Sequence, residues 1–525
     1  MTSAISIKNV STRLALVTCV IAGALQPAVT LGDAPAELTG RRPNIILILT
    51  DDQGYGDLGR HGNPVIKTPH LDRLYDEAVR FEDYHVSPTC APTRSALLSG
   101  RHEFRSGVTH TIYERERMSL ATTTIVEILK SAGYTTGIFG KWHLGDEEPY
   151  QPGNRGFDEV FIHGAGGIGQ TYPGSCGDAP ANSYFDPVIL HNGTFVKTDG
   201  YCTDVFFNQA MKWIETNKGQ QPFFCYLATN APHSPHHVPE EYEKMYAQWL
   251  ASQSDNTNPQ DAAKGPDQSK KASANIETAR FLGMITNIDD NVGRLMGKIR
   301  EWGIDRDTLV IFMTDNGGTA GCRIFNAGMK GTKGTAHNGG TRAMSLWRWP
   351  GALKPASVPA LTAHLDVFPT LAQLAGAKLS EETASELEGF SLVPLLRNAG
   401  ASWPDDRMLF THVGRWERGT PPDKFGRCSV RWRDYLYFPK PEEGELYDLR
   451  ADPGETTNII ARHPDVAAKL ATAYDRWWKG ILPDLVNEEA YKTAPSVNPF
   501  KEWYWEQYQG PGPNNAPRET KTSHP

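Results

Sequence analysis

The sequence predicts an α/β protein with a mainly parallel central sheet flanked by helices and a smaller second unit, on the basis of three observations. A chain of 525 residues is too long for one ordinary core, so we expect a large domain with a smaller partner. Residues 45–50 and 309–314 are continuous apolar runs, which are typical of strands buried on both faces of a parallel sheet. Between these runs, helical and strand patterns alternate.

Composition and charge exclude some classes of function. The hydrophobic fraction of 39% and the charged fraction of 22% are those of a soluble globular protein. A formal net charge of −8 argues against a nucleic-acid-binding protein, which normally has a basic face. An anionic substrate stays compatible with this charge, because a pocket can be locally cationic.

The first residues indicate export. Lys8 and Arg13 precede an apolar run at 14–25, and small residues follow it, which predicts a signal peptide over about residues 1–34. The run is too short to span a bilayer comfortably, and no later segment is apolar for long enough. We therefore expect a periplasmic or secreted protein with no transmembrane segment. Of its seven cysteines, Cys19 would leave with the signal.

Oxygen-bearing side chains follow both apolar runs. Asp51 and Asp52 come after the first run, and Asp315 and Asn316 after the second. Open α/β sheets place their ligands at the carboxyl ends of the strands. A turn is the ordinary explanation for paired aspartates beside glycine, but the second strand with a similar ending favours a site for Ca²⁺ or Mg²⁺.

The stretch from Ser87 to Arg101 contains Cys90 and Arg94 as Cys-x-Pro-x-Arg. Proline is tolerated in the first turn of a helix, so this stretch predicts a helix that begins at Cys90. The N–H groups of a helix N-terminus favour an anion, and Arg94 adds a cation one turn later. Taken alone, the pattern is more often a structural cysteine before a surface helix.

Three other strings combine charged or histidine side chains with glycine or proline. Gly140–Gly145, after an expected strand at 134–139, contains a lysine and a histidine. Residues 229–237, after an expected strand at 223–228, contain three histidines, but intervening prolines disfavour a zinc site. The glycine-rich segment 327–342 carries three cations, which is commonly only a flexible solvated loop.

The remaining segments define the organisation of the chain. Residues 251–274 turn polar and predict a surface insertion, and 281–302 predict a long core helix in which Asp289 and Asp290 are structural. Near the C-terminus we expect strands at 431–438 and 445–449 and a helix that begins at Pro464. The predicted boundaries are 40–400 for a catalytic α/β domain and 401–525 for a C-terminal α+β subdomain with its tail.

Together, these strings resemble the type I sulfatases of the alkaline phosphatase superfamily. The resemblance rests on Cys90 to Arg94 completed by Ser99–Arg101, on Gly140–Gly145 and on the glycine-rich string around Lys333, and it extends from about Pro43 to about Gly480. It implies an alkaline phosphatase-like fold with a C-terminal antiparallel sheet and a packed helix. It also implies an arylsulfatase-type sulfuric ester hydrolase in which a maturation enzyme oxidises Cys90 to formylglycine (3-oxoalanine).

The resemblance assigns a set of site residues. The implied ligands of one Ca²⁺ ion are Asp51, Asp52, Cys90, Asp315 and Asn316, and the implied catalytic residues are Cys90, Arg94, Lys141, His143, His233 and Lys333. In the implied mechanism one hydroxyl of the formylglycine hydrate attacks sulfur, and His233, assisted by Lys333, protonates the leaving alcohol. His143 then deprotonates the second hydroxyl, and sulfate leaves. Many sulfatases carry an acidic residue where this chain has Asn338.

The substrate is expected to be a sulfated carbohydrate, with weaker activity on aryl sulfates. Selectivity would come from the rim, for which we nominate the loop 164–177, His236, His237, Arg323 and the loop 414–427, where Trp416 is expected to stack on a sugar and arginines to meet further sulfates. Two alternatives stay open: a phosphonate or phosphate diester hydrolase of the same superfamily, and a sulfated-glycan binder without turnover.

Overall fold

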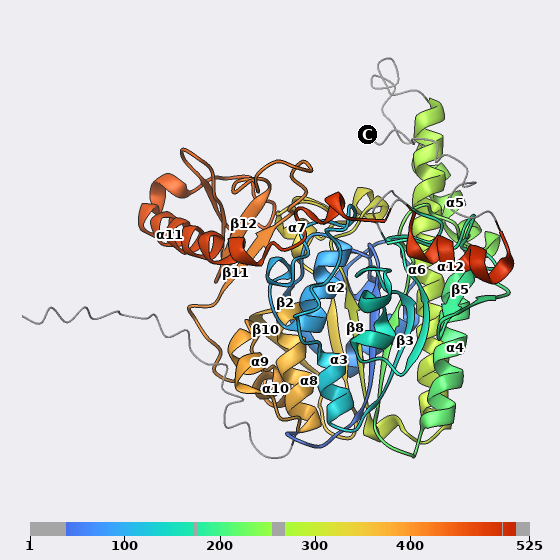
Figure 1. Cartoon of the computed structure of the whole chain (residues 1–525). Helices are drawn as coiled ribbons and strands as arrows, with labels where there is room; N and C mark the ends of the chain where they lie inside the picture. Colours follow the sequence, from blue (N-terminus) through green and yellow to red (C-terminus); the bar gives the residue numbers. More distant parts are fainter. Residues whose placement is uncertain (1–37, 172–175, 255–267, 496, 511–525) are drawn as a thin grey trace, which may run out of the picture.

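The structure is a computed structural model, and it describes residues 38–171, 176–254, 268–495 and 497–510. The predicted signal peptide and Cys19 lie outside these residues. The predicted α/β architecture is confirmed: a ten-stranded, mostly parallel sheet has the strand order β10-β2-β9-β8-β1-β7-β3-β4-β5-β6 (Figure 1). A separate four-stranded antiparallel sheet has the order β11-β12-β13-β14. Among the described helices, none is long and apolar enough to cross a membrane.

The large sheet is built from the first ten strands. They are β1 (Asn44–Thr50), β2 (Val79–His85), β3 (Thr135–Lys141), β4 (Glu159–His163), β5 (Val188–His191), β6 (Thr194–Lys197), β7 (Phe223–Ala228), β8 (Thr308–Thr314), β9 (Ser345–Arg348) and β10 (Ala356–Ala363). The α-helices are α1 (Pro69–Glu77), α2 (Cys90–Ser99), α3 (Ile125–Ser131), α4 (Cys202–Asn217), α5 (Glu240–Ser254), α6 (Gln268–Glu301), α7 (Asn338–Thr341), α8 (Val367–Ala375), α9 (Glu381–Glu386), α10 (Val393–Arg397), α11 (Pro464–Ile481) and α12 (Pro499–Tyr508).

Strand β1 lies in the middle of the large sheet and pairs in parallel with β7 and β8. Its side chains alternate between two hydrophobic cores: Ile45 and Leu47 belong to one, Ile46 and Ile48 to the other. Helices α2, α3, α8 and α10 pack in the first core, and α1, α4 and α6 in the second (Figure 1). The continuous apolar runs therefore reflect burial on both faces, as predicted.

The small sheet consists of β11 (Met408–His412), β12 (Cys428–Trp432), β13 (Tyr435–Phe438) and β14 (Glu445–Asp448). The prediction of one strand over 431–438 is wrong, because this segment is the hairpin of β12 and β13. Arg433 has a positive φ of 53°, which turns the chain where alternation alone predicts continuation. Helix α11 packs on this sheet as predicted, and Phe104, which follows α2 in the chain, inserts into the same aromatic core.

The predicted insertion at 251–274 is helical at both borders. Helix α5 ends at Ser254 and α6 begins at Gln268, and the two pack together and project beyond the body of the protein (Figure 1). Polar composition alone did not reveal these helical turns. The long core helix is confirmed, and so is the structural role of Asp289, whose carboxylate accepts hydrogen bonds from the N–H groups of His70 and Leu71 at the start of α1.

The last described helix, α12, lies apart from the small sheet (Figure 1). It contacts β6, the edge strand of the large sheet. Phe500 enters the first core of that sheet. The side-chain amide of Gln507 accepts a hydrogen bond from the N–H of Phe195 and donates one to its C=O, both at 2.7 Å. The domain boundaries given above stay a prediction.

A buried ion pair lies near the junction of the two sheets and gives a test of the fold. Arg407 binds Asp366 through two hydrogen bonds of 2.8 and 2.7 Å, with both side chains buried. We expect Arg407→Ala to lower the free energy of unfolding by about 3–5 kcal/mol, because it leaves the Asp366 carboxylate buried without its cation. Urea unfolding measures the change.

The control is Arg433→Ala, because Arg433 pairs with Asp405 at 3.7 Å on the surface, where the two side chains are 53% and 90% exposed. An exposed pair contributes less than about 1 kcal/mol, so this variant should unfold close to the parent protein. Equal unfolding free energies for the two variants would contradict the importance of the buried pair.

Candidate active site

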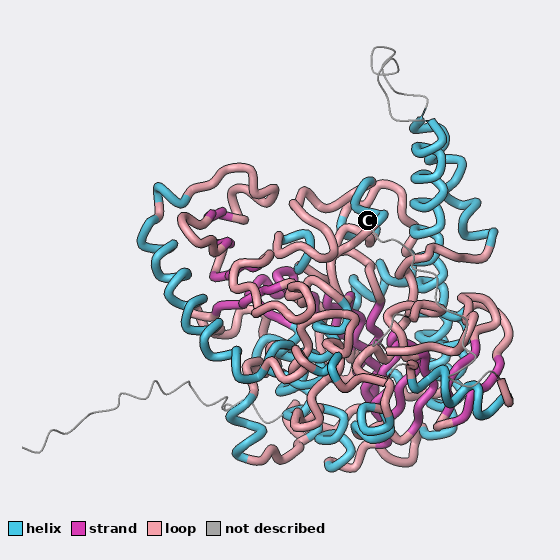
Figure 2. The backbone as a smooth tube through the Cα atoms, turned by 45° about the horizontal axis from the view of Figure 1, so that its top comes forward, coloured by secondary structure: helices cyan, strands magenta, loops and turns pink. Residues whose placement is uncertain are grey.

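The predicted site residues meet at the carboxyl edge of the large sheet. Asp51 and Asp52 follow β1, and Asp315 and Asn316 follow β8, the parallel neighbour of β1. Lys141 ends β3, and His233 follows β7. In Figure 2 loops predominate between the helical projection of α5 and α6 and the small-sheet region, and loops supply most of these side chains.

The four oxygen-bearing residues are buried and interlinked. The N–H of Asp52 donates to Asp315 Oδ1 at 3.1 Å, and the Asn316 amide nitrogen donates to Asp52 Oδ1 at 3.0 Å. Asp52 has a positive φ of 71°, which is uncommon for a residue other than glycine. At Asp52 this conformation directs the side chain of a predicted ligand toward Asn316.

These residues fit a hard divalent cation. Asp51 Oδ1 and Asn316 Oδ1 are buried and have no hydrogen-bond partner. A buried oxygen without a partner is costly, and a cation bound among these side chains would satisfy both atoms. The donors are carboxylate and amide oxygens, the ligands that Ca²⁺ and Mg²⁺ prefer. His233 also lies close enough to Asp51 and Asp52 for the three to share an ion.

Cations compensate the buried carboxylates. Lys141 pairs with Asp51, Lys333 with Asp52 at 2.6 Å, and Arg94 with Asp315 at 3.0 Å. Burial opposes the ionisation of Asp51, but Lys141 and its other neighbours outweigh this and hold the pKa of Asp51 below its ordinary value. Burial and the neighbouring Asp51 raise the pKa of Asp315.

Cys90 is the first residue of α2, as predicted, and it is 2% exposed. No side chain caps this end of the helix, so its first N–H groups stay available to an anion. Arg94, one turn later, is fully buried. The backbone N–H of Gly334, beside Lys333, donates to Pro88 O at 2.8 Å, which holds the lysine loop against the segment before Cys90.

His143 reaches the site by a backbone turn rather than by continuation of β3. The strand ends at Lys141, and His143 has a positive φ of 61°. Its Nε2 lies 2.8 Å from the carbonyl oxygen of Thr111, which can only accept, so Nε2 carries the proton. His143 Nδ1 is then an acceptor, and it is buried without a partner.

His233 is fixed in the opposite tautomer. Its Nδ1 lies 2.6 Å from the carbonyl oxygen of Ser234, so Nδ1 donates and Nε2 is left for the site. Burial, followed by the charge of Lys333, lowers the pKa of His233 to about 4. The pKa of Lys333 is raised: burial opposes its charge, but Asp52 and its other neighbours outweigh this.

The expected role of Trp416 at the rim is wrong. Trp416 is 7% exposed and packs against Phe104 and Trp478, and its Nε1 donates to Glu488 at 2.6 Å. Its ring is therefore a core ring of the small-sheet unit rather than a surface for a sugar. Nothing in the local sequence separates these two environments.

The other nominated rim residues have different surroundings. His236 and His237 line a cavity of about 450 Å³, together with Glu277. Arg323 pairs with the same Glu277 at 2.9 Å. Part of the nominated loop 164–177, namely 172–175, lies outside the described residues.

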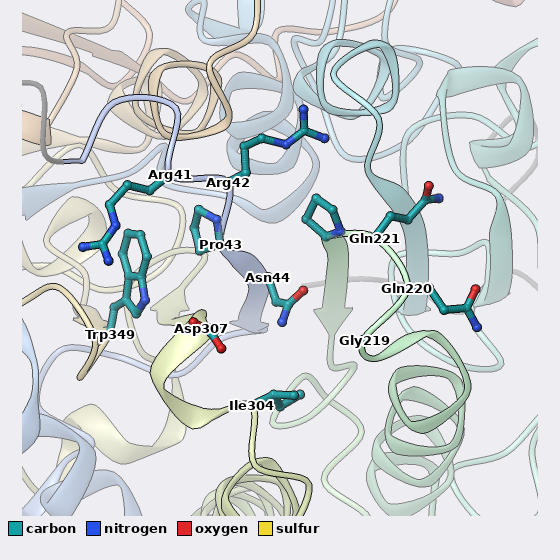
Figure 3. A pocket seen from close by; sticks show the side chains of 11 residues that line it. Arg41, Arg42, Pro43, Asn44, Gly219, Gln220, Gln221, Ile304, Asp307 and Trp349 are labelled. Atoms are coloured by element: carbon teal, nitrogen blue, oxygen red, sulfur yellow. The ribbon is translucent and has the colours of Figure 1, made fainter.

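A second cavity, of about 360 Å³, lies at the opposite edge of the sheet. Figure 3 shows Asn44 of β1 and Gln221 before β7 in its wall, with Arg41 beside Trp349. It contains none of the predicted site residues. Thr111 also contacts the site, through His143, and its sequence surroundings contain no string that predicts this. Arg415, in the nominated loop 414–427, donates to the Thr111 side chain.

Two protein-family models match the chain. The family model described as "Sulfatase" matches residues 43–377, and "N-sulphoglucosamine sulphohydrolase, C-terminal" matches 333–476. Arylsulfatase A of Homo sapiens is 31% identical over 458 residues, covering 80% of this chain and 84% of that protein. N-acetylgalactosamine-6-sulfatase of Rattus norvegicus is 31% identical over 394 residues, covering 71% and 68%.

Solved structures share the fold. Ps i-CgsB in complex with k-i-k-neocarrahexaose has a TM-score of 0.69 and 25% identity, covering 88% of this chain and all of that chain. The phosphonate monoester hydrolase of Agrobacterium radiobacter has a TM-score of 0.56 at 19% identity, which shows a shared fold alone. The sequence matches and the architecture agree, and the chain belongs to the sulfatase family of sulfuric ester hydrolases.

Proposed function

We propose that this protein hydrolyses sulfate esters of carbohydrates, using a formylglycine made from Cys90 and one Ca²⁺ ion. The observation that carries the proposal is the position of Cys90, at the uncapped N-terminus of a buried helix. Arg94 of the same helix pairs with Asp315, which belongs to the oxygen cluster formed by Asp51, Asp52, Asp315 and Asn316. This ion pair joins the helix of Cys90 to the oxygen cluster. Similarity to N-acetylgalactosamine-6-sulfatase and to a structure that holds a neocarrahexaose favours a sugar substrate, with aryl sulfates as weaker ones.

Two groups absent from the polypeptide supply part of the chemistry. The hydrated aldehyde provides a hydroxyl nucleophile and a second hydroxyl on the same carbon, and calcium neutralises negative charge. Asp51, Asp52, Asp315 and Asn316 are the residues that would hold the ion, with the modified Cys90. The remaining functions fall to side chains of this chain.

Arg94, Lys141 and Lys333 bind the transferring sulfate in this proposal. Each pairs with a carboxylate of the oxygen cluster. A divalent ion among the carboxylates would take over part of that pairing and free N–H donors for sulfate oxygens. Fixed cations in a site that excludes water are commonly the largest contribution to catalysis.

The two histidines move protons in opposite directions. His143 Nδ1 is a buried acceptor and serves as the base, and the Thr111 carbonyl holds its ring in the required tautomer. His233 protonates the leaving oxygen through Nε2, assisted by Lys333. Negative charge from a bound sulfate favours the protonated ring, which burial otherwise disfavours.

The proposal extends to maturation and location. A formylglycine-generating enzyme must act on Cys90 before the chain folds, because the folded chain buries this side chain. Export to the periplasm or the medium, directed by the signal peptide, would bring the mature enzyme to sulfated polysaccharides.

Replacement of Cys90 tests the nucleophile. We expect Cys90→Ala to lower kcat for sulfate release by at least about 10³-fold in a host that has the maturation enzyme, because no side-chain nucleophile remains. Cys322→Ser is the control, since Cys322 lies outside the proposed catalytic set. Mass spectrometry of the peptide that contains Cys90 should detect an aldehyde. Unchanged turnover by Cys90→Ala would refute the proposed chemistry.

Removal of calcium tests the metal. A chelator should lower both activity and thermal stability, since an ion at 100 times its Kd stabilises the folded state by about 2.7 kcal/mol. Added Ca²⁺ should restore both properties. In Asp51→Asn the chelator should no longer shift the melting temperature. Full activity and an unchanged melting temperature after chelation would contradict a metal site, and equal recovery with Mg²⁺ would contradict the choice of calcium.

A further inference from the structure

A group of cationic side chains lies beside His143, the proposed general base. Arg415 and Arg427 belong to the connection between β11 and β12, and the N–H of Val413 donates to Arg427 O at 3.1 Å, which closes this connection. The N–H of Arg415 donates to Thr109 O at 3.2 Å, so the connection lies against segment 109–111. The small-sheet unit thus places this arginine-bearing connection against Thr109, the residue before His110.

Arg415 is linked to His143 through one residue. Its Nη2 donates to Thr111 Oγ1 at 2.9 Å, and the carbonyl of the same Thr111 accepts from His143 Nε2 at 2.8 Å. Burial lowers the pKa of Arg415, the charge of Arg427 lowers it further, and the charge of Asp52 raises it. Arg415 therefore lies on the wall of the site that carries the proposed base.

Neither Arg415 nor Arg427 forms an ion pair with any residue in the described part of the chain. Arg415 Nε is buried without a hydrogen-bond partner. By contrast, Arg418 in the same connection pairs with Glu114 at 3.4 Å, and nearby Arg115 pairs with Glu488 at 3.1 Å. Arg415 Nε is thus a buried donor without an acceptor, which is unfavourable unless a ligand supplies one, whereas Arg427 is exposed.

Both arginines also have an uncommon backbone conformation. Arg415 has a φ of 60° and Arg427 a φ of 52°, in the left-handed region that residues other than glycine seldom adopt. Gly414, before Arg415, has its Cα close to Thr109, where an added Cβ would lie 2.0 Å from the carbonyl oxygen. The close approach of Gly414 to Thr109 holds Arg415 next to the site, where the backbone of Arg415 is strained.

His110 adds a third donor. Its Nδ1 accepts hydrogen bonds from the N–H groups of Thr111 and Ile112 at 2.8 and 3.2 Å, so the neutral ring carries its proton at Nε2. Burial and then the charge of Arg415 lower the pKa of His110 to about 2, which keeps the ring neutral. His110, Arg415 and Arg427, which we name the arginine subsite, thus offer N–H donors for an anion.

We propose that the arginine subsite binds a second anionic group of the substrate, a sulfate or a carboxylate, while the first sulfate occupies the site at Cys90. The inference rests on the proposed function and narrows its substrate class to saccharides with at least two anionic groups. Guanidinium groups suit both anions because they donate parallel N–H bonds to paired oxygens.

Binding to the full-length Cys90→Ala protein tests this inference without interference from turnover. Isothermal titration calorimetry would compare three ligands: N-acetylgalactosamine 6-sulfate, the same sugar with a second sulfate, and the same monosulfated sugar linked to a uronic acid. We expect at least one of the two dianionic ligands to bind at least about tenfold more tightly than the monosulfated sugar. Which of them does so identifies the second anion as sulfate or carboxylate.

Variants in the same background assign the preference to the arginine subsite. Arg415→Gln and Arg427→Gln should each remove most of the preference, and Arg418→Gln should keep it, because Arg418 already has Glu114 as its partner. No preference in the parent protein, or an unchanged preference in both subsite variants, would overturn the inference. Sulfate release by the wild-type enzyme from the monosulfated sugar is measured separately, so that a failure of the proposed function is distinguished from a failure of the subsite.

Discussion

The pairing of buried charges at the carboxyl edge of β1 is the constraint on which the site depends. Three carboxylates and three cations meet there: Asp51, Asp52 and Asp315 with Lys141, Lys333 and Arg94. A single uncompensated charge in such surroundings costs several kcal/mol. The partners come from β3, from α2 and from the loop before α7, so each pairing also holds a separate segment of the chain against the centre of the sheet.

The same ion pairs allow a stable fold to contain the charged groups that the proposed reaction needs. Cations that compensate the carboxylates in the folded chain are also those proposed to hold sulfate, and the carboxylates are those proposed to hold calcium. In this proposal the ion and the substrate exchange partners with groups that are already paired in the folded chain. The positive φ angles at Asp52 and His143 indicate that backbone strain is tolerated where these side chains are positioned.

The sequence predicted the large sheet and the strings that supply the site, because burial on both faces leaves a continuous apolar run such as Ile45–Thr50. It failed where one residue reverses the chain. Arg433 separates β12 from β13 within an alternating pattern. It also failed for Trp416, because whether an aromatic ring is core or surface depends on the contact with Phe104, which is more than 300 positions away in the chain.

The contact between Gln507 and Phe195 bears on association between molecules rather than on catalysis. An edge strand exposes N–H and C=O groups that can recruit a strand from another chain and start aggregation. The amide of Gln507 offers one acceptor and one donor to the same residue of β6, much as a neighbouring strand would. Gln507, together with Tyr508, whose hydroxyl also donates to Phe195 O at 3.1 Å, thus closes part of this edge to strand addition, and the large sheet can keep the edge without a further strand.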